Sequence, residues 1–325
     1  MTEFMHVANG TSTTRTIHAA GVPGRSSIWA DPLHDGPVPE GLDDEELLEV
    51  RARFIAGEVH DVKAVEADLR RWRAAVDDTT AYDELVLWYE HDLFDQLNLI
   101  QVLTRLGPDW PKPVTLICIG SFPGRPGFKG LGELTASELA PLFDTRQPIT
   151  SAQLTLGREA WQAFRSPDPA AIEQLLATDT SALPYLAAAL TRHLEEFPST
   201  RDGLSRTERR LLEIAASGPL PLIDVFPRMH DDETAFYVAD TSFLDRVREL
   251  SSPGLPLLAV DERAGSGRHG MAGVVQLTAA GREILAGADR VARYGIDRWF
   301  GGVHLTGQGP YWRWDENRGR LTADG

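Results

Sequence analysis

The stretch ELVLWYEHDLFDQLNLIQVLTRL, residues 84–106, decides the fold of this chain. Residues 84–89 form a short apolar run, which is typical of a strand buried on both faces. The run leads through two polar residues into a predicted helix over residues 92–106, in which Leu93 and Leu97 face the sheet. A buried strand followed at once by an amphipathic helix indicates a Rossmann-like α/β domain.

Three further apolar runs extend this pattern along the chain. They lie at residues 4–8, 27–30 and 114–119, and each has the length of a single strand. Because short apolar strands alternate with amphipathic segments, the sequence predicts βαβ units and a parallel sheet with helices. The other helices expected in this region cover residues 44–56, 62–76, 135–143, 151–164, 169–177 and 181–197.

The chain changes character after a break at residues 198–203. Ser205 and Glu208 form a capping-box pattern that opens the next helix. We therefore expect an α/β domain with trailing helices over residues 1–198 and a winged-helix-like α+β module over residues 204–325, an outline that other α+β modules share. The expected elements of the module are helices at 205–216, 220–229, 241–250 and 278–286, strands at 257–260 and 274–277, and a Gly-rich loop at 264–273.

The C-terminal tail is rich in tryptophan. Residues 297–305 lead through the Gly/Pro-containing turn 306–310 into residues 311–315, which predicts a β-hairpin between the two runs. Trp312 and Trp314 share one face of the second strand in this interpretation. Because large aromatic side chains need cover, we expect the tail to dock on the rest of the protein.

Composition limits the classes of protein to which the chain can belong. Its 325 residues fit two domains, and no window approaches the roughly 18 apolar residues of a membrane span. Residues 1–10 do not resemble a secretory signal. The single cysteine, Cys118, excludes an intramolecular disulfide and suits a reducing compartment. The sequence therefore predicts a cytoplasmic protein without a membrane partner.

The charge balance bears on nucleic-acid binding. The formal net charge is −16 and the pI is about 5.0. A broad face that neutralises phosphates is disfavoured, because nucleic-acid affinity depends largely on Lys and Arg contacts. A short local strip of Lys and Arg that contacts nucleic acid is compatible with this charge balance. The predicted helix over residues 241–250 carries two arginines and two acidic residues, which is a poor composition for phosphate contacts.

Polar or glycine residues follow each of the four predicted strands. Because the carboxyl ends of parallel strands lie at one edge of a sheet, these residues are expected to converge on one crevice. The strand ends carry Asn9, Gly10, Thr11 and Ser12 after the first, Asp31, His34 and Asp35 after the second, Glu90, His91, Asp92, Asp95 and Gln96 after the third, and Gly120 and Ser121 after the fourth.

Two chemical roles fit the residues that follow the third strand. On a helix His91 and Asp95 lie one turn apart, as do Asp92 and Gln96. Carboxylates with an imidazole suit acid–base catalysis or a divalent metal such as Mg²⁺ or Mn²⁺. The structural alternative is a helix N-terminus whose dipole is stabilised by acidic residues in its first turn.

The remaining candidates have similar alternatives. Residues 9–12 offer backbone N–H groups and hydroxyls to an anion, but they lack a Walker lysine and can equally form a turn with an N-cap. His34 is a candidate base or ligand in a proline-rich loop, or a histidine that caps backbone groups. His304 and Arg313 in the tail are candidates for closing the crevice on an anionic ligand, or for structural roles in a docked hairpin.

Several segments together resemble a known family. They are residues 6–12, 29–39, 88–97, 130–134 and 160–169 and the tail from Arg298 to Asp315, and they resemble bacterial proteins that carry the domain of unknown function 1835. The family often shows Asn-Gly-Asp-Ser at the first motif. This chain has Thr11 in the third place, which argues against a role for a carboxylate there. The resemblance implies an N-terminal domain of that type, and it implies no activity.

Three functions remain as hypotheses. The first is an enzyme that acts on a polar or phosphorylated small molecule, with or without a divalent metal, through Asp31, His34, Glu90, His91, Asp92 and Asp95. The ligand would be held by Asn9, Gly10, Thr11, Ser12, Gln96, His304 and Arg313. The second is a regulator in which the same crevice senses a nucleotide-like effector and the winged-helix-like module contacts DNA. The third is a non-catalytic interaction protein.

Overall fold

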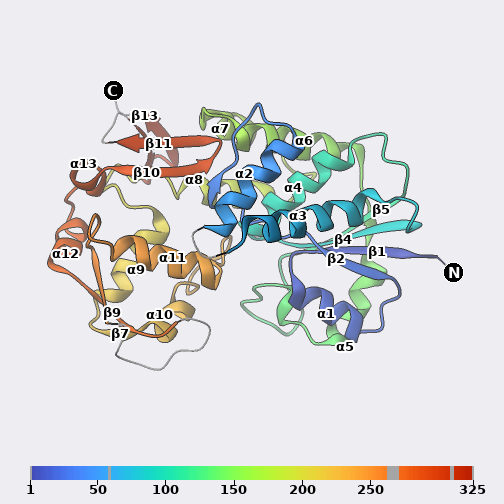
Figure 1. Ribbon diagram of the computed structural model, residues 1–325, viewed down its shortest axis with the longest axis horizontal. Coiled ribbons are helices and arrows are strands. Elements are labelled where there is room, and N and C mark those ends of the chain that lie inside the picture. Colours follow the sequence, from blue (N-terminus) through green and yellow to red (C-terminus); the bar gives the residue numbers. More distant parts are fainter. Residues whose placement is uncertain (1, 58–59, 262–270, 308–310, 324–325) are drawn as a thin grey trace. The chain divides into compact units, whose positions relative to one another are not determined.

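Five strands form a sheet in the N-terminal part of the chain, in the order β2-β1-β4-β5-β6 (Figure 1). The first four are parallel to their neighbours, and the short edge strand β6 is antiparallel to β5. This arrangement confirms the α/β fold with a parallel sheet. The strands are β1 (Phe4–Ala8), β2 (Arg25–Ile28), β4 (Glu84–Glu90), β5 (Val114–Ile119) and β6 (Gln147–Pro148).

Two compact units make up the chain in this computed structural model, which describes residues 2–57, 60–261, 271–307 and 311–323. The first unit comprises Met1–Leu190 with Gly301–Val303. The second comprises Thr191–Phe300 with His304–Gly325. The sequence places its break later, at residues 198–203, and has no signal for the three tail residues that belong to the first unit.

Backbone contacts explain why this short tail segment belongs to the first unit. The N–H of Gly302 donates to the carbonyl of Phe164 at 2.9 Å, and the N–H of Val38 donates to the carbonyl of Gly301 at 2.9 Å. A Cβ on Gly302 would lie only 1.8 Å from the carbonyl oxygen of Arg165. Only glycine allows so close an approach of two backbones.

Helices cover both faces of the sheet (Figure 1). Helices α1 (Thr11–Ala19) and α5 (Ala136–Leu139) lie on one face, where Trp88 of β4 packs in a core with Ile17 and Leu131. Helices α2, α3, α4 and α6 lie on the other face. Both faces are therefore apolar, which explains the continuous hydrophobic run in β4.

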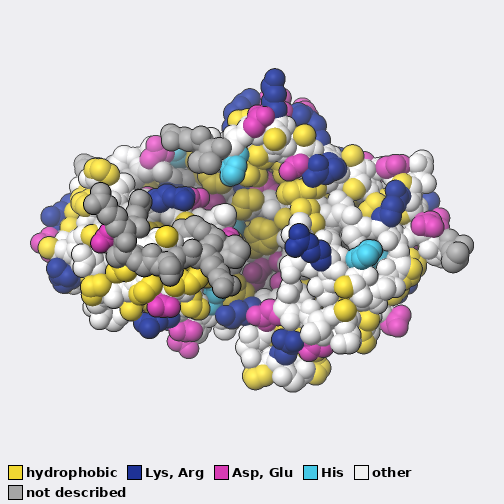
Figure 2. Space-filling view, turned by 60° about the horizontal axis from the view of Figure 1, so that its bottom comes forward, with side chains coloured by type: hydrophobic (Ala, Val, Ile, Leu, Met, Phe, Trp, Pro, Cys, Tyr) yellow, Lys and Arg dark blue, Asp and Glu magenta, His cyan; other side chains and the backbone are white. Residues whose placement is uncertain are grey.

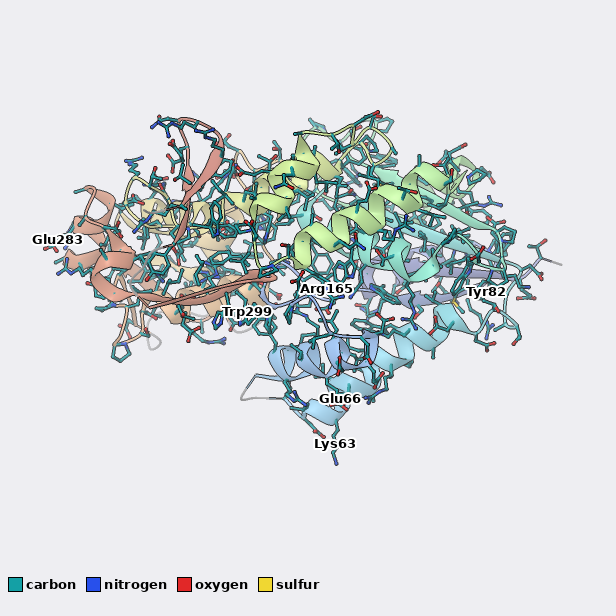
Figure 3. The ribbon with its side chains drawn as sticks, turned by 90° about the horizontal axis from the view of Figure 1, so that it is seen from above. Lys63, Glu66, Tyr82, Arg165, Glu283 and Trp299 are labelled. Carbon is teal, nitrogen blue, oxygen red and sulfur yellow. The ribbon has the colours of Figure 1, made fainter. Side chains whose placement is uncertain are left out.

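The helices of the second face start close to the predicted positions. They are α2 (Asp44–Ala56), α3 (Val62–Asp77), α4 (Leu93–Leu106) and α6 (Ser151–Arg165). Asp43 caps α2 in a capping box with Glu46. Arg165 at the end of α6, labelled in Figure 3, donates to the carbonyls of Pro39 and Leu42 and so fixes the segment before α2.

Short elements complete the first unit. Helix α8 is shorter at both ends than the helix expected at 181–197, because residues 181–185, with Pro184 among them, form turns and the helix ends at Leu194. Helix α8 also runs across the division between the two units. The short elements are β3 (Gly36–Pro37), η1 (Leu131–Glu133), η2 (Ala140–Thr145), α7 (Ala170–Leu176) and α8 (Leu186–Leu194).

The second unit contains helices and a three-stranded antiparallel sheet of order β7-β9-β8. Ser205 and Glu208 form the predicted capping box. Strand β7, between the first two helices, was not expected, and most of the predicted Gly-rich loop at 264–273 lies outside the described residues. The elements are α9 (Arg206–Ala215), β7 (Leu220–Pro221), α10 (Leu222–Arg228), α11 (Asp240–Leu250), β8 (Leu258–Asp261), β9 (Val274–Leu277), α12 (Ala279–Leu285) and α13 (Arg290–Tyr294).

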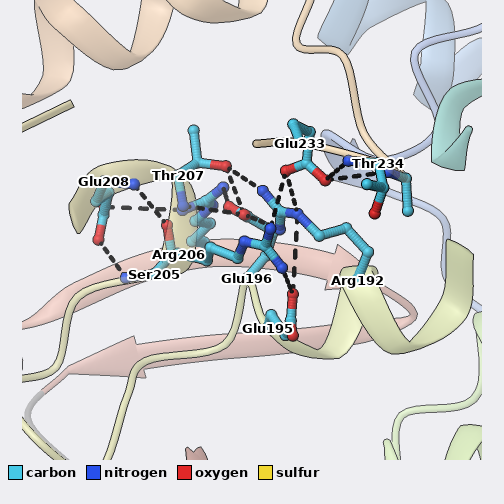
Figure 4. Close-up of polar contacts among 11 residues, drawn as sticks. Arg192, Glu195, Glu196, Ser205, Arg206, Thr207, Glu208, Glu233 and Thr234 are labelled. Carbon is cyan, nitrogen blue, oxygen red and sulfur yellow. Dashed lines mark hydrogen bonds and ion pairs between the residues drawn. The ribbon is translucent and has the colours of Figure 1, made fainter. Parts of the chain in front are cut away.

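A buried network of charged side chains occupies the second unit (Figure 4). Arg192 forms ion pairs with Glu196 at 2.6 Å and with Glu233 at 2.9 Å, and it donates to the Thr207 hydroxyl at 3.0 Å. Burial alone would raise the pKa of Glu196, but the charges of Arg192 and Arg298 lower it to about 2. The network is thus charged and internally compensated, as buried ion pairs require.

The predicted tail hairpin is wrong in its pairing. The strands are β10 (Ile296–Gly301), β11 (Val303–Gly307), β12 (Trp312–Asp315) and β13 (Arg320–Ala323). β10 is the neighbour of β11, and β12 pairs with β13. The turn from β10 to β11 contains Gly301 and the turn from β12 to β13 contains Gly319, and both glycines have a positive φ. Strand β10 therefore turns back into β11, and β12 turns back into β13.

The strand β12 lies beside the start of the segment that precedes α9. The N–H of Trp314 donates to the carbonyl of Pro198, and the N–H of Thr200 donates to the carbonyl of Trp314, both at 2.9 Å. The Trp314 side chain is buried there. Among the helices of the described residues, none is long and apolar enough to cross a membrane.

Candidate functional site

The sheet reverses its direction of winding between β1 and β4. The chain leaves β1 toward β2 on one side, and it leaves β4 toward β5 on the other side. Ligands of open parallel sheets bind at such a switch point, outside the carboxyl ends of the two strands. Asn9 follows β1 and Glu90 ends β4, so the topology brings these two predicted residues to the same place.

Hydrogen bonds tie the two strand ends to the start of α4. The Asn9 amide donates to Asp95 Oδ2 at 3.0 Å, and Asp95 Oδ1 accepts the backbone N–H of Glu90 at 3.0 Å. The hydroxyl of Thr13 donates to Asn9 Oδ1 at 2.9 Å and holds the amide in this orientation. The sequence did not single out Thr13.

Glu90 is buried beneath a glycine-containing loop. Its Oε1 accepts the backbone N–H of Leu131, and a Cβ on Gly130 would displace its carboxyl group, so the glycine permits this position of Glu90. Burial and the nearby charge of Asp92 raise the pKa of Glu90 to about 8, against the opposing hydrogen bonds from Leu131 and Asn9. Glu90 is therefore largely protonated at neutral pH.

Asp92 and Asp95 lie next to Glu90 and have different environments. Asp92 is the N-cap of α4, and its Oδ1 accepts the backbone N–H of Asp95 at 2.9 Å. Asp95 is fully buried, and burial together with the charges of Glu90 and Asp92 raises its pKa well above the usual range. Gln96 donates to the carbonyl of Glu90 at 2.6 Å and so supports the backbone of the site.

His91 and its sequence neighbour Glu90 contact different elements of the fold. Its ring centroid lies 6.0 Å from that of Tyr185, and a Cβ on Gly120 would lie 3.1 Å from the Cβ of His91. Burial lowers the pKa of His91, partly offset by a hydrogen bond with the backbone of Ile119. His91 thus lies beside the end of β5, whereas Glu90 faces Asn9 and Leu131.

Asp31 forms a buried ion pair. Its Oδ1 accepts from Nη2 of Arg51 at 2.6 Å and from Nε at 3.0 Å. Arg51 also donates to the carbonyls of Pro32, Asp35 and Pro37, so one guanidinium fixes the whole loop. Asp31 is therefore engaged structurally. The sequence carries a signal for this ion pair, because Arg51 lies on the apolar side of the helix predicted over residues 44–56.

The loop that follows Asp31 is anchored to α4. The Asn98 side chain pairs with the backbone of Asp31, donating to its carbonyl at 2.9 Å and accepting its N–H at 3.0 Å. His34 is buried, with Nε2 at 3.2 Å from a carboxylate oxygen of Asp35 and its ring at 6.0 Å from that of Phe94. Both loop residues therefore lie along α4, whose first turn carries Asp95.

The start of α1 has no side-chain cap. Gly10 is the N-cap residue and provides no side-chain cap, and the first turn contains no acidic residue. Thr11 and Ser12 are exposed, and the Ser12 hydroxyl approaches the carbonyl of Gly132 at 3.4 Å. Uncapped first-turn N–H groups favour an anion through both hydrogen bonding and the helix dipole.

Two features of the described residues concern metal and thiol groups. Within the described ranges, no group of three or more His, Cys, Asp or Glu residues is arranged to hold a metal ion. Burial raises the pKa of Cys118 to about 12, which keeps its sulfur in the thiol form.

The two tail candidates have partners inside the second unit. His304 Nε2 lies 2.7 Å from Asp297 Oδ1, and its ring stacks at 4.4 Å on Trp299, which Figure 3 labels. Arg313 pairs with Asp289 at 2.9 Å and donates to the carbonyl of Ser199 at 3.3 Å. These contacts give both residues structural roles in that unit.

Comparison with known proteins adds no family to this picture. No protein-family model matches the chain, and no curated protein sequence matches it. The resemblance to proteins with the domain of unknown function 1835 therefore stays a prediction.

Proposed function

We propose that the protein is an enzyme that acts on a polar or phosphorylated small molecule at the β1–β4 switch point, with Glu90 as its general acid or base. One observation carries this proposal: a carboxyl group whose pKa is about 8 lies at the place where parallel sheets bind ligands. Catalytic acids and bases work best with a pKa near the operating pH, and burial is the usual means of reaching it.

The neighbours of Glu90 have supporting roles in this proposal. The protonated Glu90 donates to a substrate oxygen or nitrogen, and the deprotonated form takes a proton back. Asn9 and Asp95 act as positioning residues, because they link β1, β4 and α4 through hydrogen bonds. The uncapped start of α1, with Thr11 and Ser12, binds an anionic group of the substrate.

The ligand-sensing regulator is the second candidate. It is supported by the order helix, strand, helix, helix and two strands in α9 to β9, which fits a winged-helix-like module. The distribution of charged side chains gives less support to DNA binding by this module. In α11 Arg246 and Arg248 each pair with an acidic neighbour, and on the face shown in Figure 2 Lys and Arg are scattered among acidic and uncharged side chains. Phosphate contacts need clustered cations.

A ligand panel tests the enzyme proposal. We would measure thermal shifts of the full chain with nucleotides, sugar phosphates and their dephosphorylated forms. A ligand at about 100 times its Kd adds roughly 2.7 kcal/mol of stability, which is readily detected. We expect a phosphorylated compound to stabilise the wild type and to lose that effect with Glu90→Gln.

The matched control is Glu159→Gln, which removes an exposed carboxylate from α6 in the same unit and does not act on the pKa of Glu90. We expect this variant to keep the full ligand-induced shift. Binding that survives Glu90→Gln unchanged, or is lost equally in Glu159→Gln, would contradict the assignment of Glu90. A hit should then be incubated with the enzyme and its conversion followed by NMR, since a regulator binds the compound without converting it.

A further inference from the structure

Two hydrogen-bond donors stabilise the charged form of Glu90. The backbone N–H of Leu131 and the side-chain amide of Asn9 both donate to its carboxyl group, and both lower its pKa. Burial and nearby acidic side chains act in the opposite direction. These side chains are Asp92 and Asp95 of α4 and Glu133 of η1, while Cys118 of β5 is a neutral thiol. The two donors therefore decide how readily Glu90 gives up its proton.

The two donors are held in place in different ways. The N–H of Leu131 belongs to the backbone of η1 and has a fixed direction. Asn9 donates through its side chain, and a terminal amide can turn by half a revolution. Such a turn would bring the amide oxygen to the carboxyl group in place of the NH2 group. The orientation of the Asn9 amide therefore depends on a partner on its oxygen side.

Thr13 is this partner. Its hydroxyl, in the first turn of α1, donates to Asn9 Oδ1 at 2.9 Å, and its side chain is almost completely buried. With the oxygen held in this way, the NH2 group of Asn9 donates to Asp95 Oδ2 at 3.0 Å and also to Glu90. Thr13 thus fixes a donor that two carboxyl groups share.

We propose that Thr13 is a positioning residue of this site: its hydroxyl fixes the Asn9 amide with the NH2 group toward the carboxyl groups, and so keeps Glu90 able to lose its proton. This inference rests on the proposed function, in which Glu90 exchanges a proton with the substrate. Without the Thr13 hydroxyl the amide is free to turn, and Glu90 then stays protonated over a wider range of pH.

A ¹³C NMR titration of Glu90 in the full chain tests this role. Thr13→Val keeps the branched shape of the side chain and removes the hydroxyl. We expect it to raise the pH at which Glu90 titrates by about 0.5–1 unit, the effect of losing one hydrogen bond to the charged form. Thr13→Ser keeps a hydroxyl and should titrate like the wild type. The matched control is Thr16→Val, which removes a hydroxyl that donates to the carbonyl of Ser12 at 3.1 Å in the same helix, and it should leave the titration unchanged.

Asn9→Ala shows whether Thr13 acts through Asn9. This variant removes the shared donor and should itself raise the pH at which Glu90 titrates. Thr13→Val should then have no further effect when it is added to Asn9→Ala, because the amide that Thr13 positions is gone.

Three results would overturn the proposal: an unchanged titration of Glu90 in Thr13→Val, an equal shift in Thr16→Val, or a Thr13→Val shift that persists in full beside Asn9→Ala. Failure of the proposed function is a different result, since it requires a wild-type Glu90 that titrates like an exposed glutamate. The role of Thr13 is decided by the difference between the variants. If Thr13→Val fails to fold, Thr13→Ala takes its place, because it removes the same hydroxyl.

Discussion

Buried carboxyl groups near the carboxyl edge of this sheet are stabilised in two different ways. Asp31 has a cation, Arg51, that is as buried as the carboxylate itself. Glu90 and Asp95 form no ion pair with a Lys or Arg of the described residues, and burial together with their mutual charge raises the pKa of both, which favours the protonated form. The first arrangement is suited to holding a loop, and the second to exchanging a proton.

The stability of the protein should therefore depend on pH through Glu90. Its pKa is about 8 in the folded chain against an ordinary 4.5, so the native state binds the proton more tightly. The stabilising contribution is complete below pH 4.5 and is lost as pH rises through about 8. Urea unfolding of Glu90→Gln should show a smaller loss of stability between pH 6 and 9 than the wild type. Parallel curves for the two proteins would contradict this.

Removing the carboxylate of Asp31 should be costly, because it leaves Arg51 buried without its counter-charge. We expect Asp31→Asn to lower the free energy of unfolding by about 3–5 kcal/mol. The control is Glu49→Gln, which breaks the exposed pair of Glu49 with Arg53 and should cost less than about 1 kcal/mol. Chemical denaturation measures the free energy of unfolding of both variants. If Asp31→Asn loses no more than the control, the buried pair stabilises the fold no more than an exposed one.

At the scale of elements, the sequence predicts most of the first unit because its pattern is local. The run in β4 and the caps of α2 and α4 lie within a few residues of the elements they define. β2 was predicted at residues 27–30 and lies at Arg25–Ile28, since this edge strand is half-exposed and carries little hydrophobic pattern. The tail pairing was missed because the first run turns back at Gly301, inside the run, and the second pairs with residues 320–323 through a turn at Gly319 that lies beyond it.

The candidate site could be predicted only in part. The convergence of Asn9, Glu90 and Asp95 follows from strand ends and a parallel sheet, both of which the sequence indicates. The separation of His91 from Glu90 depends on the path of the chain after β4, which a residue pattern does not show. The loop at Gly130 comes about forty residues later and reaches Glu90 only through the tertiary fold.

The N-cap of α4 gives a prediction at this scale. Asp92→Ala removes the acceptor for the N–H of Asp95 and should cost about 0.5–2 kcal/mol, whereas Asp92→Asn keeps an acceptor and should stay close to the wild type. Thermal unfolding distinguishes the two variants. A stabilised Asp92→Ala would instead show that charge repulsion with Glu90 and Asp95 outweighs the cap.

At the scale of the whole molecule, each unit depends on residues that are distant in sequence. Gly301–Val303 belong to the first unit, and β12 pairs with residues 198–200 of the second unit. The chain between residues 191 and 325 therefore cannot be assigned to one module by reading along the sequence.

The tail should contribute measurably to stability. Trp314 is 6% exposed, and Trp314→Ala should cost about 3–5 kcal/mol through lost burial and the cavity that remains. Trp312 lies two residues away on the same strand and is only half-buried, so Trp312→Ala should cost clearly less. Similar melting temperatures for Trp314→Ala and the wild type would show that the tail adds little to the fold.

The central claim is that Glu90, at the carboxyl end of β4 beside β1, holds a proton at neutral pH. The most direct measurement is a ¹³C NMR titration of the glutamate side-chain carboxyl signals, in which Glu90 is assigned by the signal missing from Glu90→Gln. The account predicts a carboxyl group that titrates near pH 8 in the wild type. A Glu90 signal that titrates below pH 5, like an ordinary exposed glutamate, would contradict it.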